Sequence, residues 1–248
     1  MEDSELEQVL QANSKLTGDL FAKFLTLATS NDDPAGLVNK LLELAPENLK
    51  KLNTAASLQA LKNAVMEWNK NKDNSNEEDW QKLLTKHWQV VGQIFSWPVS
   101  IVKEKAYVGG KDISNTGGGL VDYLIKNQIT NNVSVVEIKT PLTALTGKEY
   151  RKGVYQMSND LNGGIVQALN YKHSLMQAYN DLGAAKLFEN FDPKCFLLIG
   201  HAGNELQDMN KKRSFELFRN QLTDVQVITF DEMVMKARNL IHIFEGTA

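Results

Sequence analysis

The chain has 248 residues, of which 42% are hydrophobic and 23% are charged, and its formal net charge is −3. These proportions are typical of a folded globular protein with room for one large domain, or for a medium domain and a smaller one. They exclude a global basic field that would attract nucleic acid or an anionic membrane, so a polyanionic partner must meet a local basic patch.

Cysteine content and hydropathy favour a cytoplasmic protein. The single cysteine, Cys195, lies in the apolar run CFLLIG, where we expect it to pack as a small core residue. One cysteine excludes an internal disulfide framework. No apolar run approaches the length of a membrane span, and the first residues, MEDSELEQ, are unlike a secretory signal. We therefore expect no membrane partner.

Residues 1 to about 70 show the apolar periodicity of helices. The predicted helices cover Leu6–Leu25, the stretch from Pro34 to Pro46, and Ala55–Trp68. This part of the sequence contains no acid–base or metal-ligand cluster, so we interpret it as an all-α N-terminal region with a role in packing, regulation or assembly.

A polar stretch, NKNKDNSNEED at residues 69–79, has the composition of a linker. We place a domain boundary there, which predicts a helical region at 1–72 and a second domain at 73–248. Within the stretch, Ser75 and Glu78 have the spacing of a capping box that would start the next helix.

After about residue 94 the pattern changes to short strands that later alternate with helices. The predicted strands are Val99–Val102, Ala106–Gly109, Leu120–Lys126, Val133–Lys139, Cys195–Ile199 and Val225–Phe230. The predicted helices start near Trp80 and cover Leu161–Leu182, Glu205–Gln221 and Asp231–Phe244. This order predicts an α/β fold in which helices flank a mixed sheet.

Two neighbouring strands carry charged residues among Val, Leu and Ile. In GGGLVDYLIKNQITNNVSVVEIKTP, Asp122 lies in the first strand, and Glu137 and Lys139 lie in the second. A four-residue turn would put Asp122 opposite Glu137, with Lys139 on the same side of the sheet. Facing carboxylates need a positive charge between them, and a divalent cation such as Mg²⁺ supplies one. The alternative is an ordinary Glu137–Lys139 ion pair with Asp122 at a strand edge.

An acid in one strand, followed by the E-x-K of Glu137 to Lys139, resembles the core motif of the PD-(D/E)xK nuclease superfamily. The usual proline before the first acid is missing, since Val121 precedes Asp122. The sequence QALNY, which begins at Gln167, is similar to the Q-x-x-x-Y element of RecB-like members. These likenesses imply a restriction-endonuclease-like sheet.

Three longer segments resemble a narrower family, the Shedu anti-phage defence nucleases. They are EIKTPLTALTGKEYRKGVYQMSNDLNGGIVQALNYK, CFLLIGH and RSFELFRNQLTDVQVITFDEM. The resemblance covers roughly residues 75–245 and leaves out the helical N-terminal region. It implies a metal-dependent DNA endonuclease that hydrolyses phosphodiester bonds and that forms a homo-oligomer such as a tetramer.

The resemblance also implies a role for each site residue. Asp122, Glu137 and the backbone carbonyl of Ile138 would hold Mg²⁺, for which Mn²⁺ would substitute. Lys139 would orient the attacking water and stabilise charge on the phosphate. Gln167 would position a group near the metal.

Superfamily members often add an acid from the preceding helix, and Glu77 or Glu78 has that position here. The alternative role for Glu78 is that of a capping-box partner only. Tyr171 lies one turn after Gln167 on the same helix face, and simple packing is the alternative for that pair.

Basic and aromatic residues alternate in GKEYRKGVY, which we predict to be a flexible loop that contacts a nucleic-acid backbone. A solvated run of charges is the competing interpretation. The candidate DNA-binding residues are Lys148, Tyr150, Arg151, Lys152 and Tyr171.

Two other functions remain open on these residues. A restriction, repair or mobile-element nuclease would use the same chemistry. A protein that only binds nucleic acid or serves as a scaffold would retain the fold without activity.

Overall fold

The computed structural model describes residues 33, 36, 46–111, 116–182 and 187–246. The helices predicted before Pro46 lie outside these residues. A compact unit spans Leu58–Ala248.

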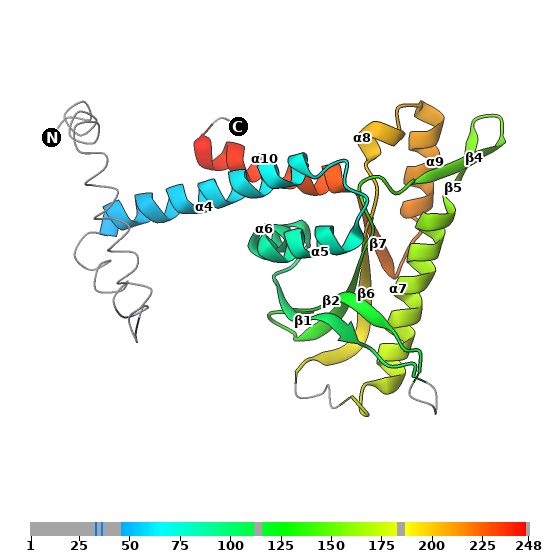
Figure 1. Ribbon diagram of the computed structural model, residues 1–248, viewed down its shortest axis with the longest axis horizontal. Helices are drawn as coiled ribbons and strands as arrows, with labels where there is room; N and C mark the ends of the chain where they lie inside the picture. Colours follow the sequence, from blue (N-terminus) through cyan, green and yellow to red (C-terminus); the bar gives the residue numbers. More distant parts are fainter. Residues whose placement is uncertain (1–32, 34–35, 37–45, 112–115, 183–186, 247–248) are drawn as a thin grey trace. The chain divides into compact units, whose positions relative to one another are not determined.

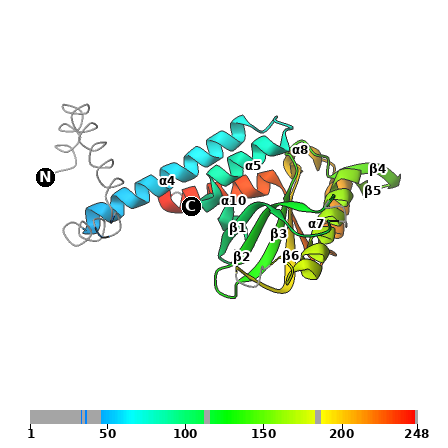
Figure 2. The same ribbon diagram turned by 60° about the horizontal axis from the view of Figure 1, so that its bottom comes forward.

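Within the described residues, the strands form a main sheet of five and a separate pair. The main sheet has the order β1-β2-β3-β6-β7, with β1, β2 and β3 antiparallel in turn and β3, β6 and β7 parallel (Figure 2). These strands are β1 (Val99–Tyr107), β2 (Leu120–Asn127), β3 (Asn132–Ile138), β6 (Glu189–Leu198) and β7 (Val225–Ile228). The pair is β4 (Thr146–Arg151) and β5 (Val154–Met157). The predicted mixed α/β sheet is thus confirmed.

Helices cover both faces of the main sheet (Figure 1). The end of α4, with α5, α6 and α10, packs on one face, and α7 and α9 pack on the other. The helices are α4 (Pro46–Lys70), α5 (Glu77–Lys86), α6 (Trp88–Val91), the 3₁₀ helix η1 (Gly92–Ile94), α7 (Asn159–Ala178), α8 (Ala202–Glu205), α9 (Met209–Arg219) and α10 (Phe230–Glu245). In the part of the chain that the structure describes, none of them has the length and hydropathy of a membrane span.

Side chains that alternate along the strands build two separate apolar clusters. Tyr123 and Phe196 point to the face with α5 and α10, and Val135 and Leu197 point to the face with α7. Because successive strand residues point to opposite faces, the near-continuous apolar runs of β3 and β6 follow directly from burial on both sides. Cys195 is fully buried as predicted.

The hairpin register predicted around the site is confirmed. Leu124 pairs with Val135 and Lys126 pairs with Val133, and the same register continued by two residues puts position 122 opposite position 137. The turn is stabilised by the side chain of Asn127, which accepts hydrogen bonds from the backbone N–H groups of Ile129 and Thr130.

The end of α4 belongs to the compact unit and not to a separate module. Trp68 is 1% exposed and packs in the same cluster as Trp80 of α5. The polar stretch between them is only a short turn. The predicted boundary between residues 72 and 73 therefore falls within the unit that begins at Leu58.

The predicted capping box at Ser75 is wrong. Asn76 caps α5, and its side chain accepts hydrogen bonds from the backbone N–H groups of Glu78 and Asp79 at 2.9 and 3.3 Å. Asparagine is as good an N-cap as serine, so the two candidates differ by one position in a stretch rich in both.

Two other elements also differ from the prediction. The strands predicted at Val99–Val102 and Ala106–Gly109 are one strand, β1, whose ladder with β2 has a bulge between Ile101 and Lys103. The helix predicted at Glu205–Gln221 is interrupted, because Asp208 caps a new helix, α9.

The loop predicted at GKEYRKGVY is a β-hairpin, β4–β5. Its strands are mostly exposed, so they lack the apolar alternation that marks a strand in a sequence. Gly153 allows the turn with φ +76°, and the buried end is anchored where Glu205 accepts hydrogen bonds from Leu145 N–H (2.6 Å) and Thr146 N–H (2.5 Å).

The packing of α4 predicts a large effect for Trp68→Ala. It should lower the free energy of unfolding of the whole chain by about 3–5 kcal/mol, because it removes a buried indole and leaves a cavity. Met66→Ala, at a half-exposed position on the same helix, is the control and should cost about 0.5 kcal/mol or less. Urea unfolding that gives equal costs for the two variants would contradict this packing.

Candidate active site

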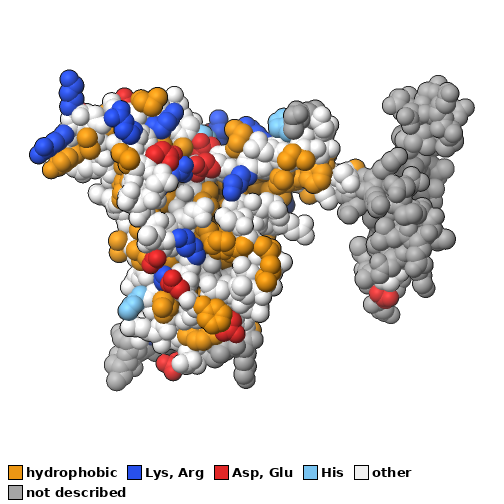
Figure 3. Space-filling view, turned by 180° about the vertical axis from the view of Figure 1, so that it is seen from behind, with side chains coloured by type: hydrophobic (Ala, Val, Ile, Leu, Met, Phe, Trp, Pro, Cys, Tyr) orange, Lys and Arg blue, Asp and Glu red, His pale blue; other side chains and the backbone are white. Residues whose placement is uncertain are grey.

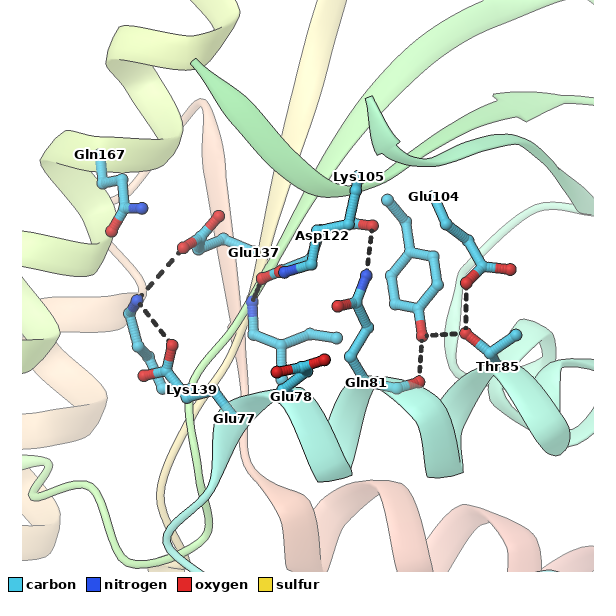
Figure 4. Close-up of polar contacts among 12 residues, drawn as sticks. Glu77, Glu78, Gln81, Thr85, Glu104, Lys105, Asp122, Glu137, Lys139 and Gln167 are labelled. Atoms are coloured by element: carbon cyan, nitrogen blue, oxygen red, sulfur yellow. Dashed lines mark hydrogen bonds and ion pairs between the residues drawn. The ribbon is translucent and has the colours of Figure 1, made fainter. Parts of the chain in front are cut away.

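The centre of the site is the carboxylate of Glu137 at the end of β3 (Figure 4). Its side chain is 4% exposed, and Oε1 lies 3.2 Å from the ammonium of Lys139. Oε2 is buried and has no hydrogen-bond partner among the described residues. Buried polar atoms are nearly always paired, so this oxygen is available to a group from outside the chain.

Burial first, and then the neighbouring carboxylate of Asp122, raise the pKa of Glu137, and Lys139 lowers it; the combined result is a pKa of about 7. The two acids are therefore close enough to repel one another, as the register requires. Near neutral pH the carboxyl of Glu137 is divided between its charged and neutral forms.

Asp122 is held by both of its carboxylate oxygens. Oδ2 accepts a hydrogen bond from the backbone N–H of Ile138 at 2.8 Å, and Oδ1 lies 2.6 Å from the ammonium of Lys105. The backbone carbonyl of Asp122 accepts a hydrogen bond from Gln81 of α5 at 3.0 Å. The N–H and C=O of a strand residue point to the same neighbour, so the carbonyl of Ile138 also faces the Asp122 side.

Lys139 contacts two acids from different elements. Its Nζ lies 3.2 Å from Glu137 and 3.6 Å from Glu77 at the start of α5. Burial by itself lowers the pKa of Lys139, but the two carboxylates outweigh it and the pKa is raised. Of the two helix acids considered, Glu77 lies at the site, whereas Glu78 pairs with Lys82 at 3.2 Å.

Gln167 projects from α7 toward the space beside Glu137 and Lys139 (Figure 4). Its amide donates a hydrogen bond to the hydroxyl of Tyr171 at 2.9 Å. An open pocket of about 580 Å³ lies here, and its wall includes Glu77, Lys139 and Gln167. Reacting groups from a ligand can therefore reach the charged centre from the α7 side.

The predicted DNA-binding residues lie in two places. Tyr171 is on α7 next to Gln167. The other four are exposed on the β4–β5 hairpin and do not touch the charged centre; they are Lys148, Tyr150, Arg151 and Lys152.

Neither Lys105 nor Gln81 was predicted from the sequence to be part of the site. Lys105 reaches Asp122 from β1, where its backbone has φ +44°, and a side-chain contact between strands leaves no periodic pattern in a sequence. Gln81 is buried in a helix predicted only from its apolar residues. A polar residue among the buried positions of α5 is the one signal that pointed to it.

The donor set fits a hard divalent cation that a ligand completes. Within the described ranges, no three His, Cys, Asp or Glu side chains are grouped to hold a metal ion by themselves. Two carboxylates are present, and Glu137 offers a buried oxygen without a partner. Mg²⁺ is commonly held by one or two carboxylates plus water and phosphate oxygens, so this incomplete set suits it.

Two comparisons with known proteins agree with one another. A family model described as "Shedu protein SduA, C-terminal" matches residues 74–234. A protein of Bacillus cereus (strain B4264) named Shedu protein SduA is 35% identical over 255 aligned positions, which cover 99% of this chain and 67% of that protein. The matched region of the family model includes every residue of the charged centre.

The raised pKa of Glu137 predicts a pH-dependent stability in the absence of metal. Between the ordinary value and about 7, the folded chain binds more protons at this carboxyl than the unfolded chain does, so wild-type stability falls as the pH rises. Glu137→Gln does not ionise. Its stability relative to wild type should therefore increase by up to roughly 3 kcal/mol between about pH 5 and about pH 8.

Urea unfolding in EDTA at both pH values measures this difference. Glu78→Gln is the matched control, because its exposed carboxylate should give the same small difference at both. If the difference in free energy of unfolding between Glu137→Gln and wild type does not change with pH, then the pKa of Glu137 is not raised by folding.

Proposed function

This chain belongs to the Shedu family, and from that premise we propose that it is a metal-dependent DNA endonuclease that serves as an anti-phage defence effector. The single observation that carries the proposal is the buried carboxylate of Glu137, which has one oxygen without a partner beside Asp122 and Lys139. Such a centre is costly for folding alone, and functional sites are where such perturbed groups cluster.

The domain is proposed to be of the PD-(D/E)xK type. Its support is the arrangement of acids on the sheet: the first acid lies on β2, and E-x-K lies at the end of the antiparallel neighbour β3. The helix α7 then brings Gln167 over the same face of the sheet. A bare Glu137–Lys139 ion pair would need neither Asp122 nor Gln167 at this place.

In this proposal Asp122, Glu137 and the carbonyl of Ile138 would hold Mg²⁺, with Glu77 at the edge of the site. Bound Mg²⁺ supplies a Lewis acid for the scissile phosphate and lowers the pKa of a coordinated water, and Mn²⁺ would serve in its place. Glu137 and Asp122 would be ionised in this state, and their negative charges would balance the charge of the bound ion.

Lys139 acts as a cation in the proposed reaction. Its pKa is raised, so it stays protonated at neutral pH and can donate hydrogen bonds to a water and to a phosphate oxygen while negative charge develops. The amide of Gln167 lies across the pocket, where it can orient the attacking water or the phosphate.

Several wider features rest on the family alone. We propose a homo-oligomer such as a tetramer, a cytoplasmic location and invading DNA as the substrate. The N-terminal region, proposed as residues 1–72, would regulate or assemble the nuclease domain at 73–248. The end of α4 shares an apolar cluster with α5, so residues 58–72 pack with the unit that contains the site.

Lys139→Ala should reduce Mg²⁺-dependent cleavage of linear and circular DNA by at least about 100-fold, because a charge-stabilising donor is lost. Lys82→Ala, an exposed lysine of α5 that pairs with Glu78, should keep wild-type activity. Protection of cells from phage should disappear with Lys139→Ala and persist with Lys82→Ala. Cleavage without protection would favour a restriction, repair or mobile-element role.

The absence of Mg²⁺-dependent cleavage by the wild-type chain on either DNA form would contradict the endonuclease proposal. Binding without cleavage would instead support a silent nucleic-acid-binding or scaffold protein. EDTA provides the metal-free control for each reaction.

The ammonium of Lys105 should compete with a bound metal ion for the carboxylate of Asp122. Its ammonium lies 2.6 Å from Asp122 Oδ1, so a cation bound by that carboxylate must displace it. Lys105→Met should tighten Mn²⁺ binding about fivefold, since one nearby charge is worth on the order of 1 kcal/mol in water-like surroundings. Lys103→Met, at an exposed position of the same strand, should leave the affinity unchanged. Calorimetry that shows weaker binding for Lys105→Met would contradict this competition.

A further inference from the structure

Two basic runs that lie about sixty residues apart in the sequence meet on one surface. The β4–β5 hairpin packs against the start of α9, where Tyr155 N–H donates a hydrogen bond to the hydroxyl of Ser214 at 3.1 Å. The ammonium of Lys211 lies 5.6 Å from the centre of the Tyr155 ring. We call this the hairpin–α9 surface, and its basic residues are Lys148, Arg151, Lys152, Lys211, Lys212 and Arg213.

The cations of the hairpin–α9 surface are not neutralised by the protein. In the ranges that the structure describes, none of the six forms an ion pair, whereas Lys172 and Arg219 are each paired with two acids. The nearby acids have other roles: Glu149 accepts a hydrogen bond from Gly153 N–H, and Asp208 caps α9. A chain with a net charge of −3 therefore gathers positive charge in one place (Figure 3).

The surface continues from the pocket of the candidate active site. The pocket wall includes Ala144, just before β4, and Asn159, just after β5, as well as Lys139. The two strands of the hairpin thus leave directly from the edge of the pocket. A duplex bound at Lys139 would therefore pass close to the base of the hairpin.

The hairpin has the form of a narrow two-stranded ribbon with an exposed tip. Tyr150 is 63% exposed, and the guanidinium of Arg151 lies 5.6 Å from the centre of its ring. The major groove of B-DNA is wide enough to admit a two-stranded β-ribbon. Phosphates of a duplex recur along both strands, so a ribbon in or across a groove would meet them on either side.

We propose that the hairpin–α9 surface is a second contact for duplex DNA, in which the hairpin lies along a groove and α9 holds the flanking phosphates. The inference rests on the proposed nuclease function and adds the substrate class, a duplex that extends well beyond the active-site pocket. A few scattered lysines would not require this geometry. Here two elements from distant parts of the sequence are joined by a side-chain hydrogen bond and a cation–π contact.

The test measures DNA binding in EDTA, where no cleavage occurs, by fluorescence anisotropy of the full chain. The probe is a labelled duplex of about three helical turns, roughly 30 base pairs. Two double variants reverse charge on either element: Arg151→Glu with Lys152→Glu on the hairpin, and Lys212→Glu with Arg213→Glu on α9. The control pair, Lys70→Glu with Arg238→Glu, makes the same change in net charge on helices of the other sheet face.

Each surface variant should bind the duplex at least about tenfold more weakly than wild type. The slope of log affinity against log salt, from about 50 to about 200 mM, should fall by about one for each lost phosphate contact. The control pair should keep both the affinity and the slope close to wild type. Circular dichroism establishes that each variant is folded. The α9 variant is expected to fold because acidic residues near the start of a helix stabilise it.

Three results would overturn the inference. If wild type binds and cleaves DNA but the surface variants have the same duplex affinity as the control pair, the inference fails and the proposed function stands. Loss of single-strand binding with unchanged duplex affinity, or loss of binding to anionic vesicles alone, would assign the surface to another partner. Wild type that neither binds nor cleaves the duplex contradicts the proposed function itself.

Discussion

The site depends on one constraint, a carboxylate held out of water with only half of its hydrogen bonds made. Glu137 gives one oxygen to Lys139 and keeps the other unpartnered inside the sheet. A buried charge is costly unless it is paired, so either a proton or an added cation must compensate for it. The raised pKa means that a proton neutralises Glu137 more readily than an exposed carboxylate. In the proposed function, a divalent metal ion neutralises it instead.

The surrounding elements keep this unfavourable arrangement in place. The β2–β3 register puts Asp122 beside Glu137, and α5 fixes that register from the opposite face. Gln81 donates a hydrogen bond to the Asp122 carbonyl and accepts one from the hydroxyl of Tyr123 at 2.7 Å. Burial raises the pKa of Tyr123, so its hydroxyl remains a donor at every relevant pH. Backbone contacts thus hold the two acids side by side against their mutual repulsion.

The pairing of the two acids could be predicted from the sequence because the side-chain period of a strand is always two. Asp122 and Glu137 stand at fixed distances from a polar turn, and a period of two decides which residues share a face. Gln167 was predicted from the resemblance to the Q-x-x-x-Y element and not from periodicity. The pairing of Leu124 with Val135 bears out the reasoning on which the pairing of the two acids rests.

Other features depend on contacts that leave no periodic signal. Lys105 reaches Asp122 through a side-chain contact between two strands, and the β4–β5 hairpin is too polar on both sides to look like a strand. Asn76 and not Ser75 caps α5, and Glu77, the first residue of that helix, lies beside Lys139. The partnership of the hairpin with α9 is a tertiary contact across about sixty residues, which local patterns do not encode.

The most direct test of the central claim is the position of Mn²⁺ in crystals of the wild-type chain, located by its anomalous scattering. The account predicts an ion bonded to a carboxylate oxygen of Asp122 and to the buried Oε2 of Glu137, at about 2.0–2.2 Å, with Lys105 displaced from Asp122. An ion bound elsewhere, with Lys105 still on Asp122 and Oε2 of Glu137 still unpartnered, would contradict it.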